Sequence, residues 1–150
     1  MSRPLRLLFI CHGNICRSPM AEAIAEAHGD TIGLPVEARS AGILGLVDRP
    51  ADPKAVAVCR EIGLDLRDHR SQPITPELLA WADHVLTMDA SQAAHLREHY
   101  EVPGDKVLLL GAFGGYPAID DPMGGWTFTF RRCRRRIEAS VHALLRRLAR

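Results

Sequence analysis

Four short segments with the pattern of β-strands, each bounded by polar or turn residues, stand out along the chain. They lie at residues 5–10, 36–40, 84–88 and 106–110. The first run is apolar at every position except Arg6, which is typical of a strand buried on both faces of a parallel sheet. We therefore predict four strands, the first of which leads directly into Cys11.

Helix signals fill the stretches between these runs. A favoured N-cap residue precedes proline at Ser18-Pro19, Asp52-Pro53 and Thr75-Pro76, and each pair predicts a helix start. The expected ends are His28-Gly29 for the first helix, Gly63 for the second, whose apolar positions are Val56, Cys59 and Ile62, and Trp81 for the third.

Two further helices are predicted in the second half of the chain. One covers residues 91–98. The other is long and C-terminal, with one apolar stripe made of Phe130, Cys133, Ile137, Val141, Leu144 and Leu148.

Strands that alternate with helices through the whole chain predict an α/β fold with three layers, in which helices flank a parallel sheet of about four strands. The chain shows no repeat and no linker, so we expect a single domain over residues 1–150. Ligands of such sheets bind beyond the carboxyl ends of the strands. Cys11 ends the first predicted strand and is therefore a candidate site residue.

Composition excludes several classes of protein. Of the 150 residues, 47% are apolar and 25% charged, as in ordinary globular proteins, which excludes disordered and fibrous chains. The longest stretch without charge, 107–119, is too short to cross a membrane, and the apolar run at 7–10 is too short for a secretory signal. Four cysteines are too few for a disulfide scaffold. We expect reduced thiols and a cytoplasmic protein.

The net charge of +1 conceals an uneven distribution. Residues 1–130 contain 11 basic and 17 acidic side chains, whereas residues 131–150 contain 8 and 1. The basic end is compatible with binding to nucleic acid, an acidic protein or a membrane. Because its apolar stripe already packs on the sheet, we favour a solvated helix face and expect neither a nucleic-acid nor a membrane partner.

The loop Cys11-His12-Gly13-Asn14-Ile15-Cys16-Arg17-Ser18 contains the clearest candidate chemistry. It joins a strand to a helix N-terminus, where backbone N–H groups and the helix dipole favour an oxyanion such as phosphate. Arg17 can grip two oxygens of that anion with its planar guanidinium. The same field favours the thiolate form of Cys11, which makes this residue a candidate nucleophile. Gly13 and Asn14 tolerate the left-handed backbone that such a loop needs.

Other readings of this loop are weaker. Cys11 and Cys16 do not have the spacing of a zinc knuckle, and no second ligand pair follows, so we expect no metal. The loop lacks the Gly-Lys-Ser/Thr of a nucleotide-binding P-loop, and we expect no cofactor. A buried thiol with no chemical role is the remaining alternative for Cys11.

Residues 11–18, continued by Pro19-Met20-Ala21-Glu22, resemble the opening of the low-molecular-weight protein tyrosine phosphatases. Asp121-Pro122 resembles the general-acid motif of that family, and Ser40-Ala41-Gly42 and Met88-Asp89 also match it. The resemblance covers nearly the whole chain. It implies a phosphatase that needs no cofactor, acts on a phosphorylated protein and binds inorganic phosphate or other oxyanions in its loop.

The resemblance also implies a role for each matched residue. Cys11 would attack phosphorus, Arg17 and the loop amides would stabilise the equatorial oxygens, and Asp121, rather than its neighbour Asp120, would protonate the leaving group. The hydroxyl of Ser18 would support the Cys11 thiolate. Asn14 would keep the loop in shape, held by Ser40 and His69; alternatively, Ser40 merely ends a strand and His69 lies on the surface.

The substrate is less clearly indicated. Many members of the family have two aromatic residues after the Asp-Pro pair, where this chain has Met123-Gly124-Gly125, and residues 43–47 are aliphatic where an aromatic is often found. Asp-Pro-x-Gly-Gly resembles the protein-arginine phosphatases of the same family, whereas Ile15 resembles the tyrosine phosphatases. We predict phosphotyrosine first and phosphoarginine second, because an apolar Ile15 favours an aromatic neighbour.

The remaining cysteines suggest two further hypotheses. Thiol-dependent arsenate reductases share this loop, but the chain lacks cysteine between residues 85 and 104, and Cys59 and Cys133 lie on apolar helix stripes. Reduction of arsenate is therefore disfavoured. Cys16 lies on the same tight loop as Cys11 and is a candidate redox partner that captures an oxidised Cys11 as a disulfide. The alternative is that Cys16 only packs beneath the loop.

Overall fold

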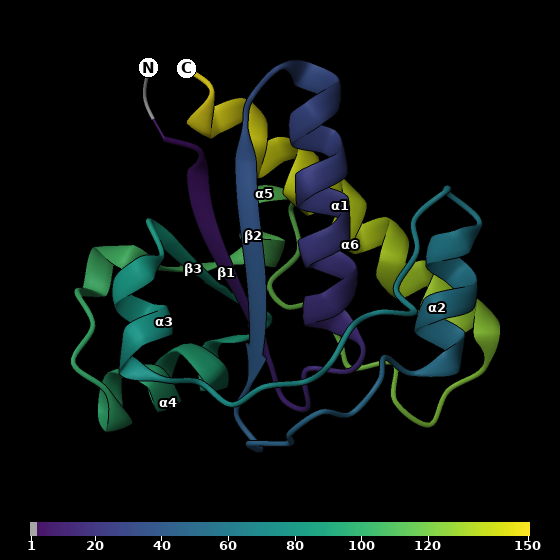
Figure 1. Ribbon diagram of the computed structural model, residues 1–150, viewed down its shortest axis with the longest axis horizontal. Coiled ribbons are helices and arrows are strands. Elements are labelled where there is room, and N and C mark those ends of the chain that lie inside the picture. Colours follow the sequence, from purple (N-terminus) through teal and green to yellow (C-terminus); the bar gives the residue numbers. More distant parts are fainter. Residues whose placement is uncertain (1–2) are drawn as a thin grey trace.

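The computed structural model describes residues 3–150, and a sheet of four parallel strands lies at its centre (Figure 1). The strands are β1 (Leu5–Cys11), β2 (Val36–Gly42), β3 (His84–Thr87) and β4 (Val107–Leu109), in the spatial order β2-β1-β3-β4. Because β1 pairs with β2 on one side and β3 on the other, the chain reverses its direction of winding at β1. The carboxyl end of β1 is therefore the expected ligand position in such a sheet.

Helices cover both faces of this sheet and complete the three predicted layers (Figure 1). Phe9 faces a core built with α1 (Arg17–Ile32), α2 (Pro53–Arg60), α5 (Leu110–Phe113) and α6 (Thr127–Leu148). Ile10, its neighbour in β1, points to the other face and packs with α3 (Pro76–Trp81) and α4 (Ala90–His99). A 3-10 turn, η1 (Gly104–Lys106), precedes β4. The predicted α/β architecture is confirmed.

The predicted boundaries of the first helix were wrong at both ends. The helix continues past His28-Gly29 to Ile32, and Gly33, with a φ of 72°, caps its C-terminus. Gly29 does not end the helix. It lets the backbone of Leu34 pack close to the helix, because a Cβ at position 29 would lie 2.6 Å from the carbonyl oxygen of Leu34. Ser18 lies inside the helix and is not its N-cap; Cys16 takes that position without a side-chain cap. The hydroxyl of Ser18 is thereby free to contact Cys11.

Other boundaries differ by a few residues. The second helix ends at Arg60, so Ile62 lies outside it and is partly exposed. The fourth helix begins one residue early, because the carboxylate of Asp89 accepts the backbone N–H of Gln92 and caps it. Leu110 starts α5 instead of ending a strand, since a continuous apolar run does not distinguish the two structures.

The basic C-terminal helix is only partly the solvated face that its sequence predicts. Arg134 is buried, where it donates to the carbonyl oxygen of Val58 at 2.8 Å and pairs with Glu61 and Glu138. Arg131 pairs with the same Glu61. These contacts join α6 to α2. Within residues 3–150, no helix is both long and apolar enough to span a bilayer.

Candidate active site

The loop after β1 wraps around the sulfur of Cys11. This side chain is almost fully buried, and its Sγ accepts the backbone N–H of Asn14 at 3.2 Å. The Oγ of Ser18 lies 2.9 Å from the same sulfur. Two polar groups, one from the loop and one from the first turn of α1, therefore lie within hydrogen-bond distance of one sulfur.

Asn14 organises the loop. Its φ of 58° is left-handed, a conformation that asparagine tolerates better than most residues. The fully buried side chain donates from Nδ2 to the Oγ of Ser18 at 2.8 Å, and Oδ1 accepts the backbone N–H of Gln72 at 2.9 Å. The Nε2 of His69 lies 2.6 Å from the backbone oxygen of Asn14. Burial lowers the pKa of His69, so a neutral ring that donates from Nε2 fits this contact.

Ser40 does not hold Asn14, contrary to the sequence prediction. Its hydroxyl donates to the carboxylate of Glu22 at 2.8 Å, and its backbone oxygen accepts from the side chain of Gln72 at 3.0 Å. Gln72 is therefore the residue that joins β2 to the loop, and sequence reasoning missed it. Nothing in its local pattern marks it, because it lies in an irregular segment far from residue 14 in the sequence.

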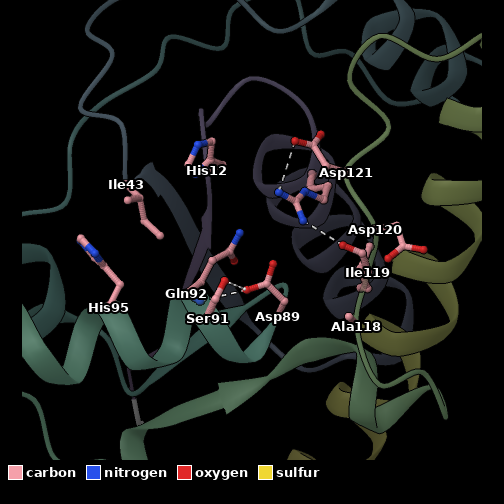
Figure 2. A pocket seen from close by; sticks show the side chains of 11 residues that line it. His12, Ile43, Asp89, Ser91, Gln92, His95, Ala118, Ile119, Asp120 and Asp121 are labelled. Carbon is pink, nitrogen blue, oxygen red and sulfur yellow. Dashed lines mark hydrogen bonds and ion pairs between the residues drawn. The ribbon is translucent and has the colours of Figure 1, made fainter.

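Arg17 and Asp121 meet beside this loop. The guanidinium of Arg17 is nearly buried and donates to the carbonyl oxygen of Ile119 at 2.8 Å. Its other terminal nitrogen lies 3.7 Å from Oδ2 of Asp121 (Figure 2). The side chain of Asp120 is 87% exposed, and its ion-pair contact is with Arg136 on α6, 3.9 Å away. Of the two acids, only Asp121 also borders the cavity over Cys11.

Two cavities meet at this point. One, of about 190 Å³, contains Cys11 and is walled by Gly13, Ile15, Cys16, Leu44, Leu46 and Met123. The other, of about 390 Å³, extends toward α4, where Asp89, Ser91, Gln92 and His95 line it (Figure 2). His12, Arg17 and Asp121 border both cavities. The first is mostly apolar above the thiol, and the second has polar and apolar walls in similar measure.

The other thiols have different environments. Cys16 contacts the sulfur of Met123 at 3.6 Å, and burial raises the pKa of its thiol. Burial also raises the pKa of Cys59 and of Cys133 to about 12. None of the four cysteines is in a disulfide, and all four are buried. Among residues 3–150, no cluster of three or more His, Cys, Asp or Glu side chains could hold a metal ion.

Comparisons with known proteins agree with this geometry. Residues 6–150 match the family model described as low molecular weight phosphotyrosine protein phosphatase. The chain is 36% identical to the probable low molecular weight protein-tyrosine-phosphatase EpsP of Ralstonia nicotianae, over 95% of this chain and 94% of that one. It is also 36% identical to the protein-arginine-phosphatase of Geobacillus stearothermophilus, over 97% of each chain.

A solved structure extends the comparison to the fold. The arginine phosphatase YwlE, in a serine variant with a phosphorylated active-site serine, superposes with a TM-score of 0.92 at 32% identity. The match covers 97% of each chain. In that protein the active-site side chain therefore accepts a phosphoryl group.

Proposed function

The chain belongs to the low molecular weight phosphotyrosine protein phosphatase family, and we propose that it hydrolyses phosphotyrosine in proteins through a phosphocysteine on Cys11. The observation that most supports this proposal is the buried thiol of Cys11 beneath an apolar cavity, with Arg17 and Asp121 at its edge. Nucleophile and anion clamp come from one loop, the acid comes from a segment remote in sequence, and all three meet at one cavity.

In the first step, the Cys11 thiolate attacks phosphorus in line with the phenolic oxygen. The guanidinium of Arg17 and the N–H groups at the start of α1 stabilise charge on the equatorial oxygens. Asp121 gives its proton to the departing oxygen as the bond from phosphorus to oxygen breaks.

In the second step, water replaces the thiolate at phosphorus. Asp121, now ionised, accepts a proton from this water as the bond from sulfur to phosphorus breaks. Inorganic phosphate leaves, and the hydroxyl of Ser18 at 2.9 Å stabilises the returning Cys11 thiolate. No metal is needed in either step, because Arg17 and the loop amides supply the positive charge.

The walls of the cavity favour an aromatic substrate. Ile15, Leu44, Leu46 and Met123 line it above the thiol. Moving a phenyl ring from water to such walls lowers the free energy of the complex. A phosphoguanidinium would instead lose hydrogen bonds to water that aliphatic side chains cannot replace. Phosphotyrosine is therefore the first candidate.

Phosphoarginine is the second candidate, because a relative of equal identity is named a protein-arginine-phosphatase. The carboxylate of Asp121 at the cavity edge is the group that would contact a guanidinium. Reduction of arsenate finds no support, since the chain has no cysteine between residues 85 and 104, and burial raises the pKa of Cys16, Cys59 and Cys133.

Initial rates on p-nitrophenyl phosphate in the presence of a chelator test the mechanism. We expect hydrolysis without metal, no turnover in Cys11→Ser, and a loss of about 10³-fold or more in Arg17→Ala, because an anion clamp acts only together with the nucleophile. Arg135→Ala, which removes an exposed arginine from α6, is the matched control and should keep its activity. Metal-dependent activity that survives Cys11→Ser would contradict the proposal.

Matched peptides that contain phosphotyrosine or phosphoarginine test the substrate. We expect the larger kcat/KM for phosphotyrosine. A preference for phosphoarginine would reverse the order of the two candidates and leave the mechanism unchanged.

A further inference from the structure

A groove of about 800 Å³ lies between β4, α5 and the last turns of α6. Each of these three elements contributes one large apolar side chain to its wall, and the end of the chain contributes three arginines. These residues are Leu108, Phe113, Leu148, Arg146, Arg147 and Arg150. None of them lines either cavity at the catalytic loop. We call this feature the C-terminal groove.

The C-terminal groove lies away from the catalytic loop. His142, next to the groove residue Ala143, stacks on His28 with ring centroids 3.8 Å apart. His28 follows Arg17 by eleven residues in α1, which corresponds to roughly 16 Å of helix. Figure 1 shows the end of α6 near the start of β1, whereas the strands point toward the catalytic loop. A ligand in the groove therefore does not occupy the catalytic cavities.

The apolar wall of the groove lies at the edge of the sheet. Within residues 3–150, β4 pairs with β3 on one side and with no strand on the other. Leu108, Phe113 and Leu148 pack against the core on the side of α6 and remain half-buried. An apolar side chain that enters the groove would cover the part of these residues that is still exposed, which lowers the free energy of the complex.

The arginines of the groove have no acidic partner. Arg146, Arg147 and Arg150 are exposed, and no carboxylate within residues 3–150 forms an ion pair with any of them. By contrast, Arg134 on the same helix pairs with Glu61 at 2.8 Å. A terminal carboxylate on Arg150 would offset one of the three charges and leave two. The groove therefore presents uncompensated positive charge beside an apolar wall.

We propose that the C-terminal groove is a docking site for an acidic segment of a partner protein. Asp or Glu side chains of this segment pair with the arginines, and an apolar side chain next to them rests on Leu108, Phe113 and Leu148. Charge complementarity supports this occupant, because carboxylates bind guanidinium groups through two parallel hydrogen bonds. A volume of about 800 Å³ has room for several side chains. The proposal goes beyond the proposed function, since no step of that reaction uses the groove.

Two other anionic partners fit the groove less well. A lipid bilayer needs apolar side chains that project outward, whereas none of the large apolar residues of the groove is exposed. The backbone of a nucleic acid would pair with the arginines but would leave the apolar wall uncovered. An acidic segment that also contains apolar residues contacts both parts of the groove.

Peptide display tests the proposal without assuming the sequence of the partner. Short random peptides are selected on the wild-type chain, after removal of all peptides that bind the double variant Arg146→Gln, Arg147→Gln. Glutamine keeps the helix propensity of arginine and removes its charge. Peptides that bind the catalytic cavity are removed together with the variant. We expect the remaining peptides to share Asp or Glu next to Leu, Ile or Phe. No remaining peptide, or only peptides without acidic residues, would overturn the proposal.

The affinity of the selected peptides separates the effects of charge and shape. We expect Kd to rise about tenfold or more in Arg146→Gln, Arg147→Gln, and also in Ala112→Phe, which fills the groove and leaves its charges in place. The double variant Arg97→Gln, Arg135→Gln removes the same charge from exposed positions outside the groove and should bind like wild type. Equal weakening in this control would show that only net charge matters and would overturn the groove as a site.

Thermal unfolding followed by circular dichroism checks that the variants fold. The transition should be unchanged in all three, because every altered side chain is exposed. This readout, like peptide binding, does not depend on catalysis, so failure of the groove and failure of the proposed function are distinguishable.

Anionic vesicles, duplex DNA and the chain itself are the remaining probes. At about 0.15 M salt, we expect neither phosphatidylserine vesicles nor DNA to displace a selected peptide. Binding to either one that is lost in Arg146→Gln, Arg147→Gln, with no acidic peptide selected, would assign the groove to lipid or nucleic acid instead. Self-association that is lost in the same variant would assign it to a second copy of this chain.

Discussion

Asp120 and Asp121 are adjacent in sequence and yet have different environments. Asp121 lies beside Arg17 at the catalytic cavity, whereas Asp120 projects toward α6 with 87% of its side chain exposed. We predict that Asp121→Asn lowers kcat by about 10²- to 10⁴-fold on phosphotyrosine, because an amide cannot protonate the leaving oxygen. The loss should shrink for aryl phosphates with acidic phenols, which leave without help.

Asp120→Asn is the matched control for this prediction. It removes the same charge from the neighbouring position and should retain activity within about twofold, since exposed ion pairs contribute little. Equal losses of Asp121→Asn across a series of leaving groups would indicate a structural role for Asp121.

We predict that Cys16 protects Cys11 against oxidation by forming a disulfide with it. Mild peroxide should oxidise the Cys11 thiolate to a sulfenic acid. The sulfur of Cys16 then attacks the sulfenic sulfur, the S–O bond breaks, and the oxygen leaves as water with the thiol proton, which forms a disulfide. Burial raises the pKa of Cys16, so this capture should be slower than for an exposed thiol. Intact mass should then fall by about two hydrogens per chain, and a dithiol should restore activity.

The variant Cys16→Ser tests protection by this disulfide. Without a resolving thiol, much of the inactivation by peroxide should become permanent, because the sulfenic acid oxidises further. Cys59→Ser should behave like the unmodified chain. Full recovery of Cys16→Ser, or a disulfide that includes Cys59 or Cys133, would show that Cys16 only packs beneath the loop.

At the scale of elements, the end of β2 sets the position of the catalytic loop. A Cβ at Gly42 would lie 3.0 Å from the backbone nitrogen and from the Cβ of Asn14, and equally close to the carbonyl carbon of Gly13. Strand and loop are in contact through backbone at this point. A side chain at position 42 would push on Asn14, whose N–H reaches the sulfur of Cys11, and the loop would have to shift by a few tenths of an ångström.

We therefore predict that Gly42→Ala displaces the loop. Activity should fall by about tenfold or more, since small displacements of catalytic groups have large effects, and unfolding should become easier by about 1–3 kcal/mol. Rates and urea denaturation of the same preparation measure the two effects. Gly104→Ala, where an added Cβ meets open space, is the control. Wild-type rates in Gly42→Ala would show that the loop tolerates the shift.

At the scale of the whole molecule, one half-buried carboxyl makes stability depend on pH. Burial raises the pKa of Glu22 from 4.5 to about 7, opposed by its hydrogen bond from Ser40 and aided by the charge of Glu26. The folded state thus holds this proton over a range in which the unfolded chain has lost it. The contribution of Glu22 is full below pH 4.5 and is lost as pH rises through about 7.

Glu22→Gln should flatten this part of the profile. As pH rises from 5 to 8, the unfolding free energy of the variant should increase relative to that of wild type by up to about 3 kcal/mol, because a glutamine buries no charge at either pH. Urea denaturation at both pH values measures the difference. The lowered pKa values of His28 and His69 make stability rise with pH, opposite to the effect of Glu22. Both histidines are present in wild type and variant, so their contribution cancels in the difference between the two. Glu98→Gln, on the exposed face of α4, should show no such gain.

The sequence by itself determined the α/β class, the parallel strands and the order of elements, because apolar periodicity and capping residues are local signals. It also singled out Cys11, Arg17 and Asp121, since the loop motif and the Asp-Pro pair are short and contiguous. Helix ends such as Gly29 were misjudged, because the reason for that glycine is a contact with the backbone of a later residue.

Only the tertiary structure decided which side chains support the loop. Asn14 is held by His69 and Gln72 and not by the hydroxyl of Ser40, which turns to Glu22. It also separated Trp126 and Phe128 from the core aromatic Phe130. These outcomes depend on distances between residues remote in sequence, which are fixed only when helices and strands pack together. Local patterns encode which elements form, and packing decides which polar groups meet.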